Sequence, residues 1–80
     1  MSEEFRKQAH DLDVTVWVGK KGLDAVVDEL SDQLDSEELV KTKFLRSARG
    51  TDDTEELAAD LAERVDAEVI ETRGHTAVFH

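Results

Sequence analysis

Two glycines enclose two lysines at Gly19-Lys20-Lys21-Gly22, directly after an apolar run. If the run is a strand and a helix follows, the loop lies at a helix N-terminus, where free backbone N–H groups and the helix dipole favour an anion. Glycine lets the backbone approach a phosphate closely, and lysine adds a mobile positive charge. KH domains clamp nucleotide backbone with a comparable G-x-x-G loop. A plain strand-to-helix turn would have the same composition, so the loop indicates a phosphate site only together with other basic segments.

Most of the other basic residues lie in segments that contain no acid. Asp and Glu are missing from residues 14–23, 39–51 and 72–80. If these windows meet in the fold, they form a positive patch on a negative body. The alternative is that strands and turns carry fewer acids than helices. The windows hold seven of the ten lysines and arginines, namely Lys20, Lys21, Lys41, Lys43, Arg46, Arg49 and Arg73.

Two aromatic side chains could contact bases rather than phosphates. Trp17 could stack on an unpaired base, but a lone tryptophan more often packs beneath a helix, and we expect packing beneath an N-terminal helix. His75 could stack or donate a hydrogen bond. The run Arg73-Gly74-His75 would lie beside the Gly19 loop if the last hairpin neighbours the first strand.

The hydrophobic spacing predicts an α/β (α+β) two-layer sandwich in the order α-β-α-β-α-β-β. Alternation predicts that Val14, Val16 and Val18 share one strand face, and that Lys41 and Lys43 point away from the buried face of the second strand. Crossovers between parallel strands and a final antiparallel hairpin then give a four-stranded mixed sheet. Thr51 or Thr54 would cap the third helix. The expected helices are residues 2–12, residues 23–35 and a third that begins after Thr51 or Thr54 and runs to about residue 65. The expected strands are 14–18, 39–45, 67–72 and 75–79, and residues 46–50 are a basic loop.

The composition excludes several kinds of chemistry. There is no cysteine, so disulfides, thiolate metal sites and cysteine catalysis are absent. The three histidines have no ligand spacing, and no nucleophile motif or Walker A loop is present. We therefore expect a cytoplasmic, non-enzymatic single domain over residues 1–80, without metal, cofactor or membrane association. The net charge of −10 would fit either adaptation to a salt-rich cytoplasm or a basic partner.

Three runs, in order and over nearly the whole chain, resemble the CRM (chloroplast RNA splicing and ribosome maturation) domain. The first is Ala9-His10-Asp11-Leu12 followed by Val16-Trp17-Val18-Gly19-Lys20-Lys21-Gly22-Leu23. The second is Glu38-Leu39-Val40-Lys41-Thr42-Lys43-Phe44-Leu45. The third is Val69-Ile70-Glu71-Thr72-Arg73-Gly74-His75-Thr76-Ala77-Val78-Phe79. The stand-alone prokaryotic members of this family are called YhbY-like proteins.

The resemblance implies a fold similar to the C-terminal domain of translation initiation factor three. It also implies RNA binding without catalysis or cofactor, since stand-alone bacterial members are linked to precursors of the large ribosomal subunit, and plant members to group II intron splicing. Family members are often strongly basic, whereas this chain is acidic. The expected partner is structured ribosomal RNA, with the large subunit as the larger assembly and the protein as a monomer. The candidate RNA-binding residues are Gly19, Lys20, Lys21, Gly22, Lys41, Lys43, Arg46, Arg49, Arg73, Gly74 and His75.

Two other functions fit parts of the sequence. Alba-like nucleic-acid-binding proteins have a similar strand order and can carry a Gly-Lys-Lys loop after the first strand, but Gly22 and the extra N-terminal helix favour the CRM family. An acidic protein–protein adaptor without a nucleic-acid partner would account for the net charge. RNA crosslinking in cells separates the adaptor from the other two.

Overall fold

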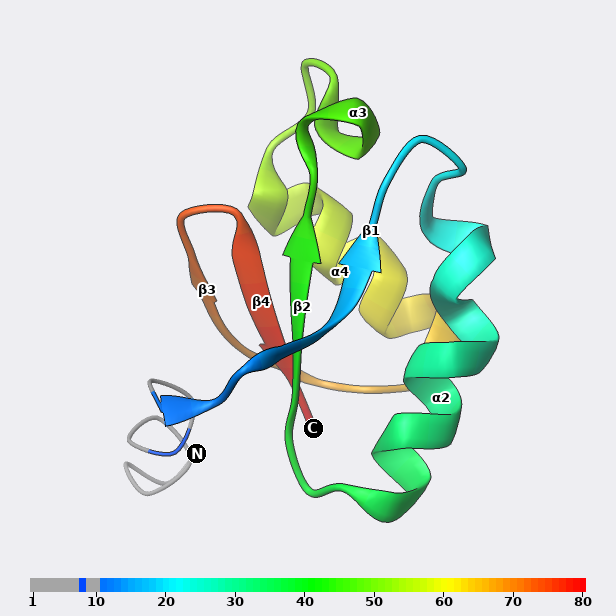
Figure 1. The fold of residues 1–80 in the computed structure, drawn as a ribbon, viewed down its shortest axis with the longest axis vertical. Coiled ribbons are helices and arrows are strands. Elements are labelled where there is room, and N and C mark those ends of the chain that lie inside the picture. Colours follow the sequence, from blue (N-terminus) through cyan, green and yellow to red (C-terminus); the bar gives the residue numbers. More distant parts are fainter. Residues whose placement is uncertain (1–7, 9–10) are drawn as a thin grey trace.

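Four short strands form one mixed sheet (Figure 1). The structure is a computed structural model that describes Gln8 and residues 11–80, so the predicted first helix lies largely outside the described residues. The sheet order is β1-β2-β4-β3, with β1 parallel to β2 and β4 antiparallel to both of its neighbours. The predicted α+β architecture and mixed sheet are confirmed. The strands are β1 (Val14–Val18), β2 (Val40–Phe44), β3 (Val69–Arg73) and β4 (Thr76–Phe79).

Two helical segments differ from the prediction. The helix expected from residue 23 begins as a 3₁₀ turn, η1 (Leu23–Val26), and becomes the α-helix α2 (Val27–Ser36) only afterwards. The expected basic loop contains a single helical turn, α3 (Arg46–Arg49), because Leu45 is extended and its carbonyl accepts the Arg49 N–H at 3.1 Å. Asp53, rather than Thr51 or Thr54, precedes the first residue of α4 (Thr54–Val65).

The core lies between one face of the sheet and the helices α2 and α4. Apolar side chains from every layer meet there, and α4 lies behind the sheet in Figure 1. Val40, Thr42 and Phe44 face these helices, and Lys41 and Lys43 are more exposed, as the alternation predicted. The fully buried members of the core include Val16, Val18, Leu30, Phe44, Ala58, Leu61, Ala77 and Phe79.

A bulge in β1 changes the predicted alternation. Val14 pairs with Lys41 and Val16 with Thr42, so one extra residue, Thr15, lies between them on the β1 side. Val16 and Val18 therefore share the buried face, and the prediction that Val14 joins them is wrong. Thr15 turns toward α2, where its hydroxyl donates to Gln33 Oε1 at 2.6 Å.

One hydroxyl in the core has no hydrogen-bond partner. Thr42 is completely buried on the helix-facing side of β2, and its Oγ1 lacks a partner. A buried unsatisfied hydroxyl costs free energy because its bonds to water are lost. We expect Thr42→Val, which keeps the shape, to raise the free energy of unfolding by about 1 kcal/mol. Urea unfolding checks this, and a variant less stable than wild type would contradict it.

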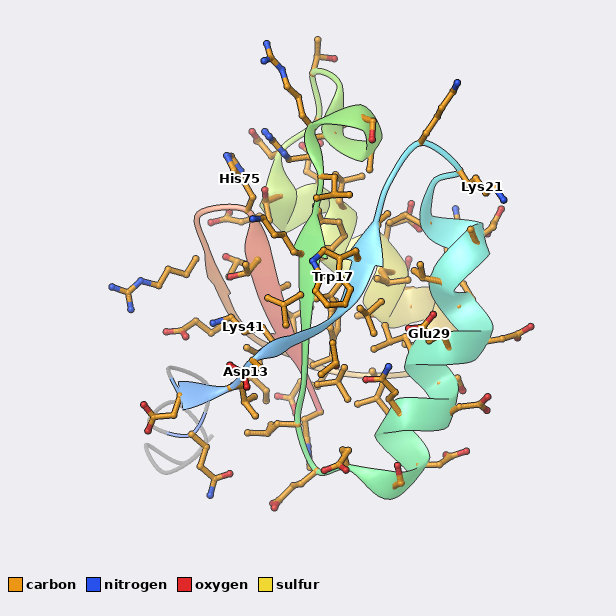
Figure 2. All side chains as sticks on the ribbon, in the orientation of Figure 1. Asp13, Trp17, Lys21, Glu29, Lys41 and His75 are labelled. Atoms are coloured by element: carbon orange, nitrogen blue, oxygen red, sulfur yellow. The ribbon has the colours of Figure 1, made fainter. Side chains whose placement is uncertain are left out.

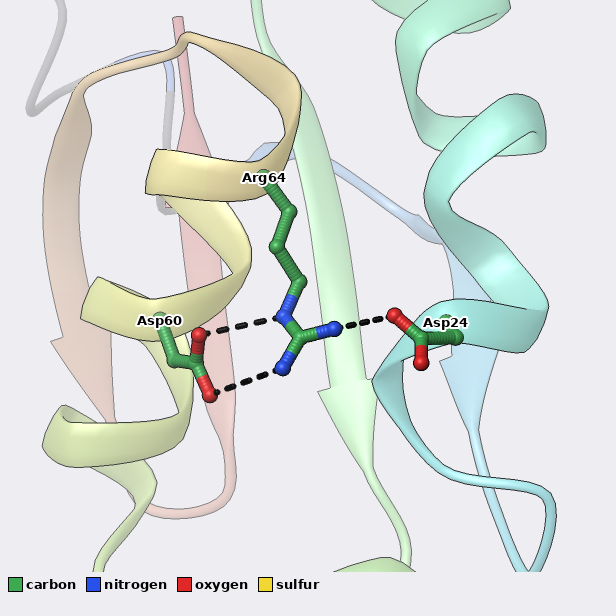
Figure 3. Close-up of polar contacts among 3 residues, drawn as sticks. All are labelled: Asp24, Asp60 and Arg64. Atoms are coloured by element: carbon green, nitrogen blue, oxygen red, sulfur yellow. Dashed lines mark hydrogen bonds and ion pairs between the residues drawn. The ribbon is translucent and has the colours of Figure 1, made fainter.

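An ion-paired arginine joins α4 to η1 (Figure 3). Arg64 Nε donates to Asp60 Oδ1 at 3.1 Å one turn earlier in α4, and its Nη1 donates to Asp24. The hydrogen bond to Asp60 and the charges of Asp24 and Asp60 raise the pKa of Arg64 above its ordinary value. A raised pKa stabilises the fold below the unfolded-state pKa, so this contribution is constant across neutral pH. The guanidinium of Arg64 is thus already paired with two carboxylates on the helix side of the molecule.

Candidate nucleic-acid interface

The three acid-free segments meet at one end of the sheet. β1, β2 and β3 run in the same direction, so the loops after them emerge at the same edge. The Leu45 N–H donates to the Val18 carbonyl at 2.8 Å, and the Phe44 N–H donates to the His75 carbonyl at 2.8 Å. These two bonds join the end of β2 to the other two segments. Figure 2 shows Lys21 and His75 at this end of the molecule. We call this surface, formed by residues 19–22, 46–50 and 73–75, the basic end.

The hairpin lies at a different place in the basic end from the one predicted. β4 pairs with β2 rather than with β1, so the run Arg73-Gly74-His75 is not beside the Gly19 loop. The turn of α3 follows β2 and therefore lies between them (Figure 1). The basic end is consequently a row of three segments, with α3 in the middle.

The Gly19–Gly22 loop is a hydrogen-bonded tight turn. The Gly22 N–H donates to the Gly19 carbonyl at 2.9 Å, and Lys20 and Lys21 occupy the two exposed central positions. The following η1 is only a four-residue 3₁₀ turn, so the predicted contribution of an α-helix N-terminus does not apply here. The loop can therefore offer a ligand the two mobile ammonium groups of its lysines. The glycines on either side have no side chain that would keep a ligand from the backbone.

The two glycines of this loop have different structural roles. Gly22 has φ +83°, which L side chains rarely adopt, whereas a Cβ on Gly19 would make ordinary contacts of 3.6 Å with Leu45 and 3.7 Å with Ser47. We expect Gly22→Ala to lower the free energy of unfolding by about 1–3 kcal/mol and Gly19→Ala to change it far less. Thermal unfolding of both variants checks this, and equal melting temperatures would contradict it.

The two arginines of α3 are not equivalent. Arg46 is exposed, whereas Arg49 is half-buried and its Nε donates to the Phe44 carbonyl at 3.1 Å. Arg49 therefore holds α3 against the end of β2, and only its remaining N–H groups can reach a ligand. Arg46 can bind phosphate without giving up a contact of this kind.

The hairpin turn completes the basic end. Gly74 has φ +58°, and the Thr76 hydroxyl donates to the Arg73 carbonyl at 2.8 Å, which fixes the turn. Arg73, Gly74 and His75 are exposed. The side chains of Arg73 and His75 thus project from a hydrogen-bonded turn.

A cavity of about 430 Å³ lies between α3, α4 and the hairpin turn. Arg49, Arg73 and His75 line it, but so do three acids that follow the acid-free window in sequence, Asp52, Asp53 and Glu55. Carboxylates oppose an anion, so the cavity is not a phosphate pocket by itself. The sequence windows did not anticipate these acids because the start of α4 folds back beside α3.

The remaining sequence candidates lie on the face of the sheet opposite α2 and α4. Part of this face is covered, because Val78, which pairs with Lys41, is buried in a second apolar cluster with Leu39 and Ile70. Lys43 pairs with Trp17 across β1 and β2, next to the basic end, whereas Lys41 lies one row farther away beside Val14. Trp17 is 53% exposed. The expectation that it packs beneath the N-terminal helix concerns a segment that lies largely outside the described residues, so it stays a prediction. The sequence does place Trp17 on the face opposite the core, because it alternates with the buried Val16 and Val18.

The described residues contain no candidate metal centre and no membrane-spanning helix. Among them, no group of three or more histidine or acidic side chains could hold a metal ion. No helix among the described residues has the length and apolar character needed to cross a membrane.

The fold defines the class as small α+β domains with helices on one face of a mixed four-stranded sheet. The family model described as the CRS1 / YhbY (CRM) domain matches residues 2–80, and the chain belongs to this family. The predicted membership is thereby confirmed, and the Alba-like alternative is set aside.

Two similar proteins carry names that concern RNA. A protein of Methanocaldococcus jannaschii named a probable RNA-binding protein is 40% identical over 75 residues, which is 94% of this chain and 56% of the relative. The chain thus spans about half the length of that relative. The solution structure of a hypothetical protein from Staphylococcus aureus, described as a candidate RNA-binding protein, superposes with a TM-score of 0.80 at 29% identity. That match covers 98% of this chain and 80% of the other.

Proposed function

We propose that the protein is a non-catalytic RNA-binding protein that holds structured ribosomal RNA, in large-subunit precursors, through the basic end. The observation that carries the proposal is the meeting of three acid-free basic segments at one edge of the sheet. The names of the two similar proteins support RNA as the ligand. Lys20, Lys21, Arg46 and Arg73 would contact the phosphate backbone, and His75 would contact a base or sugar.

The separation of positive and negative charge in the molecule supports RNA binding through the basic end. The exposed positions of α2 and α4 carry Asp28, Glu29, Asp32, Asp35, Glu55, Glu56, Asp60 and Glu63. The basic end lies away from most of these acids, although Asp52, Asp53 and Glu55 adjoin it. A dipolar protein of this kind is repelled by RNA on its helix side and attracted on one end. The net charge of −10 therefore orients binding rather than excluding it.

The target is tested by crosslinking RNA to the protein in its native host and sequencing what is recovered. The proposal expects enrichment of large-subunit ribosomal RNA at a few structured regions. Recovery of messenger or transfer RNA would retain RNA binding and overturn the ribosomal target. If no RNA is recovered and protein partners are found instead, the acidic adaptor is the correct reading.

The acidic helix side leads to a prediction about salt. Clustered like charges on α2 and α4 repel one another, and at 1 M salt the repulsion between exposed charges more than about 3 Å apart is largely screened. If the acidity is an adaptation to a salt-rich cytoplasm, the free energy of unfolding rises between dilute buffer and molar potassium chloride. Thermal unfolding at both salt concentrations checks this, and equal melting temperatures would contradict it.

A further inference from the structure

The face of the sheet opposite α2 and α4 carries an exposed aromatic side chain near the basic end, outside the buried cluster of Leu39, Ile70 and Val78. Trp17 of β1 pairs with Lys43 of β2, and the same row continues through Thr76 of β4 to Arg73 of β3. Side chains that pair across neighbouring strands point to the same face, so these four form one row. Figure 2 shows the Trp17 ring over β1 and β2 on the side turned to the viewer, away from α4.

The neighbours of Trp17 indicate what could cover it. A large apolar ring that is 53% exposed gains free energy when a flat apolar partner covers it. The row around it contains two cations, Lys43 and Arg73, one hydroxyl and no carboxylate. An apolar protein patch would leave Lys43 without compensation beside the ring. A nucleotide presents both complements, since its base has a π-face and its backbone carries negative charge.

We propose that Trp17 is a stacking platform for one unpaired RNA base, with Lys43 beside it on the flanking phosphate. The inference rests on the RNA binding proposed above and adds a second subsite to the basic end. Trp17 lies two residues before Gly19, a distance of about 7 Å along a strand. A strand of RNA held at the Gly19–Gly22 loop therefore passes the ring with a neighbouring nucleotide.

This subsite differs from the lysine loop in its dependence on salt. Phosphate contacts release counterions, so each one adds to the slope of affinity against salt. Stacking releases none, so the contribution of Trp17 is the same in dilute and concentrated salt. In a protein with net charge −10, such a contact maintains affinity where electrostatic attraction is screened.

Fluorescence gives a direct test, because Trp17 is the only tryptophan and the chain has no tyrosine. The probe is an RNA stem-loop whose loop contains only adenosine, compared with a blunt duplex of the same stem. We expect the stem-loop to quench Trp17 emission and the duplex to quench it far less. We also expect Trp17→Leu to weaken stem-loop binding at least about fivefold, with an unchanged salt slope. Trp17→Phe restores most of that loss.

Each other outcome has a definite meaning. If the wild-type chain binds the stem-loop, and neither Trp17→Leu nor the emission spectrum responds, the stacking site is overturned while RNA binding stands. If the wild-type chain binds neither RNA, both proposals fail. If sedimentation shows a dimer that Trp17→Leu dissociates, a second copy of the chain covers the ring and the stacking proposal is overturned. Trp17 is exposed, so its variants are expected to fold, and circular dichroism verifies this.

Discussion

Replacing both loop lysines, Lys20→Gln plus Lys21→Gln, is expected to weaken binding to structured ribosomal RNA about 10- to 50-fold at roughly 0.1 M salt. The size follows from counterion release, since each lost phosphate contact removes about 0.7–0.9 from the slope of log affinity against log salt. The double variant should therefore also have a slope smaller by roughly 1.5–2. Fluorescence anisotropy over a series of salt concentrations measures both quantities.

The control for this variant must change the net charge equally at another place. Ser36→Glu plus Ala59→Glu adds two negative charges at exposed positions of α2 and α4. It has the same net charge as the loop variant but an intact basic end. We expect it to bind RNA close to wild-type strength. If the two variants lose affinity equally, only the overall charge matters, and the loop has no specific role.

Phe44→Ala is expected to have the largest effect on stability, lowering the free energy of unfolding by about 3–5 kcal/mol. Phe44 is the last residue of β2, and its side chain is completely buried in the core. Its backbone also joins the basic end, because its N–H donates to the His75 carbonyl and its carbonyl accepts from Arg49. Domains of this size unfold with only about 4–12 kcal/mol, so this change removes a large share of the stability. Urea unfolding followed by circular dichroism measures it.

The adjacent residue gives a matched control for Phe44→Ala. Lys43 is exposed on the opposite face of β2, so Lys43→Ala should alter the free energy of unfolding by less than about 0.5 kcal/mol. It should weaken RNA binding instead. If Phe44→Ala lowers stability and Lys43→Ala lowers RNA affinity, the two faces of β2 have different roles, one in the core and one in binding. A loss of less than about 1 kcal/mol in Phe44→Ala would contradict the described core.

Local patterns in the sequence were sufficient for the strands and for most of the helices. Period-two alternation identified the buried face of β2, and helical spacing identified α2 and α4. The errors occurred where a backbone detail overrides the pattern. The bulge at Thr15 moves Val14 off the buried face. The extended Leu45 precedes a helical turn in a segment that was predicted to be a loop.

The candidate site was less accessible to sequence reasoning, because it depends on which strands are neighbours. The basic windows were visible in the chain, but the insertion of β4 between β2 and β3 determines that α3 lies between the loop and the hairpin. The acids beside Arg49 and Arg73 were also hidden, since they belong to the start of α4. The sequence also does not show that Trp17 pairs with Lys43 across β1 and β2, which is the observation that relates the exposed ring to a neighbouring cation.

The proposed RNA interface is tested most directly by mapping which residues of the protein contact RNA. Ultraviolet crosslinking of the full chain to large-subunit ribosomal RNA, followed by mass spectrometry of the crosslinked peptides, gives the contact residues. We predict crosslinks at residues 17–22, 43–49 and 73–75, on three segments far apart in sequence. Crosslinks concentrated on the acidic faces of α2 and α4, with none in those segments, would contradict it.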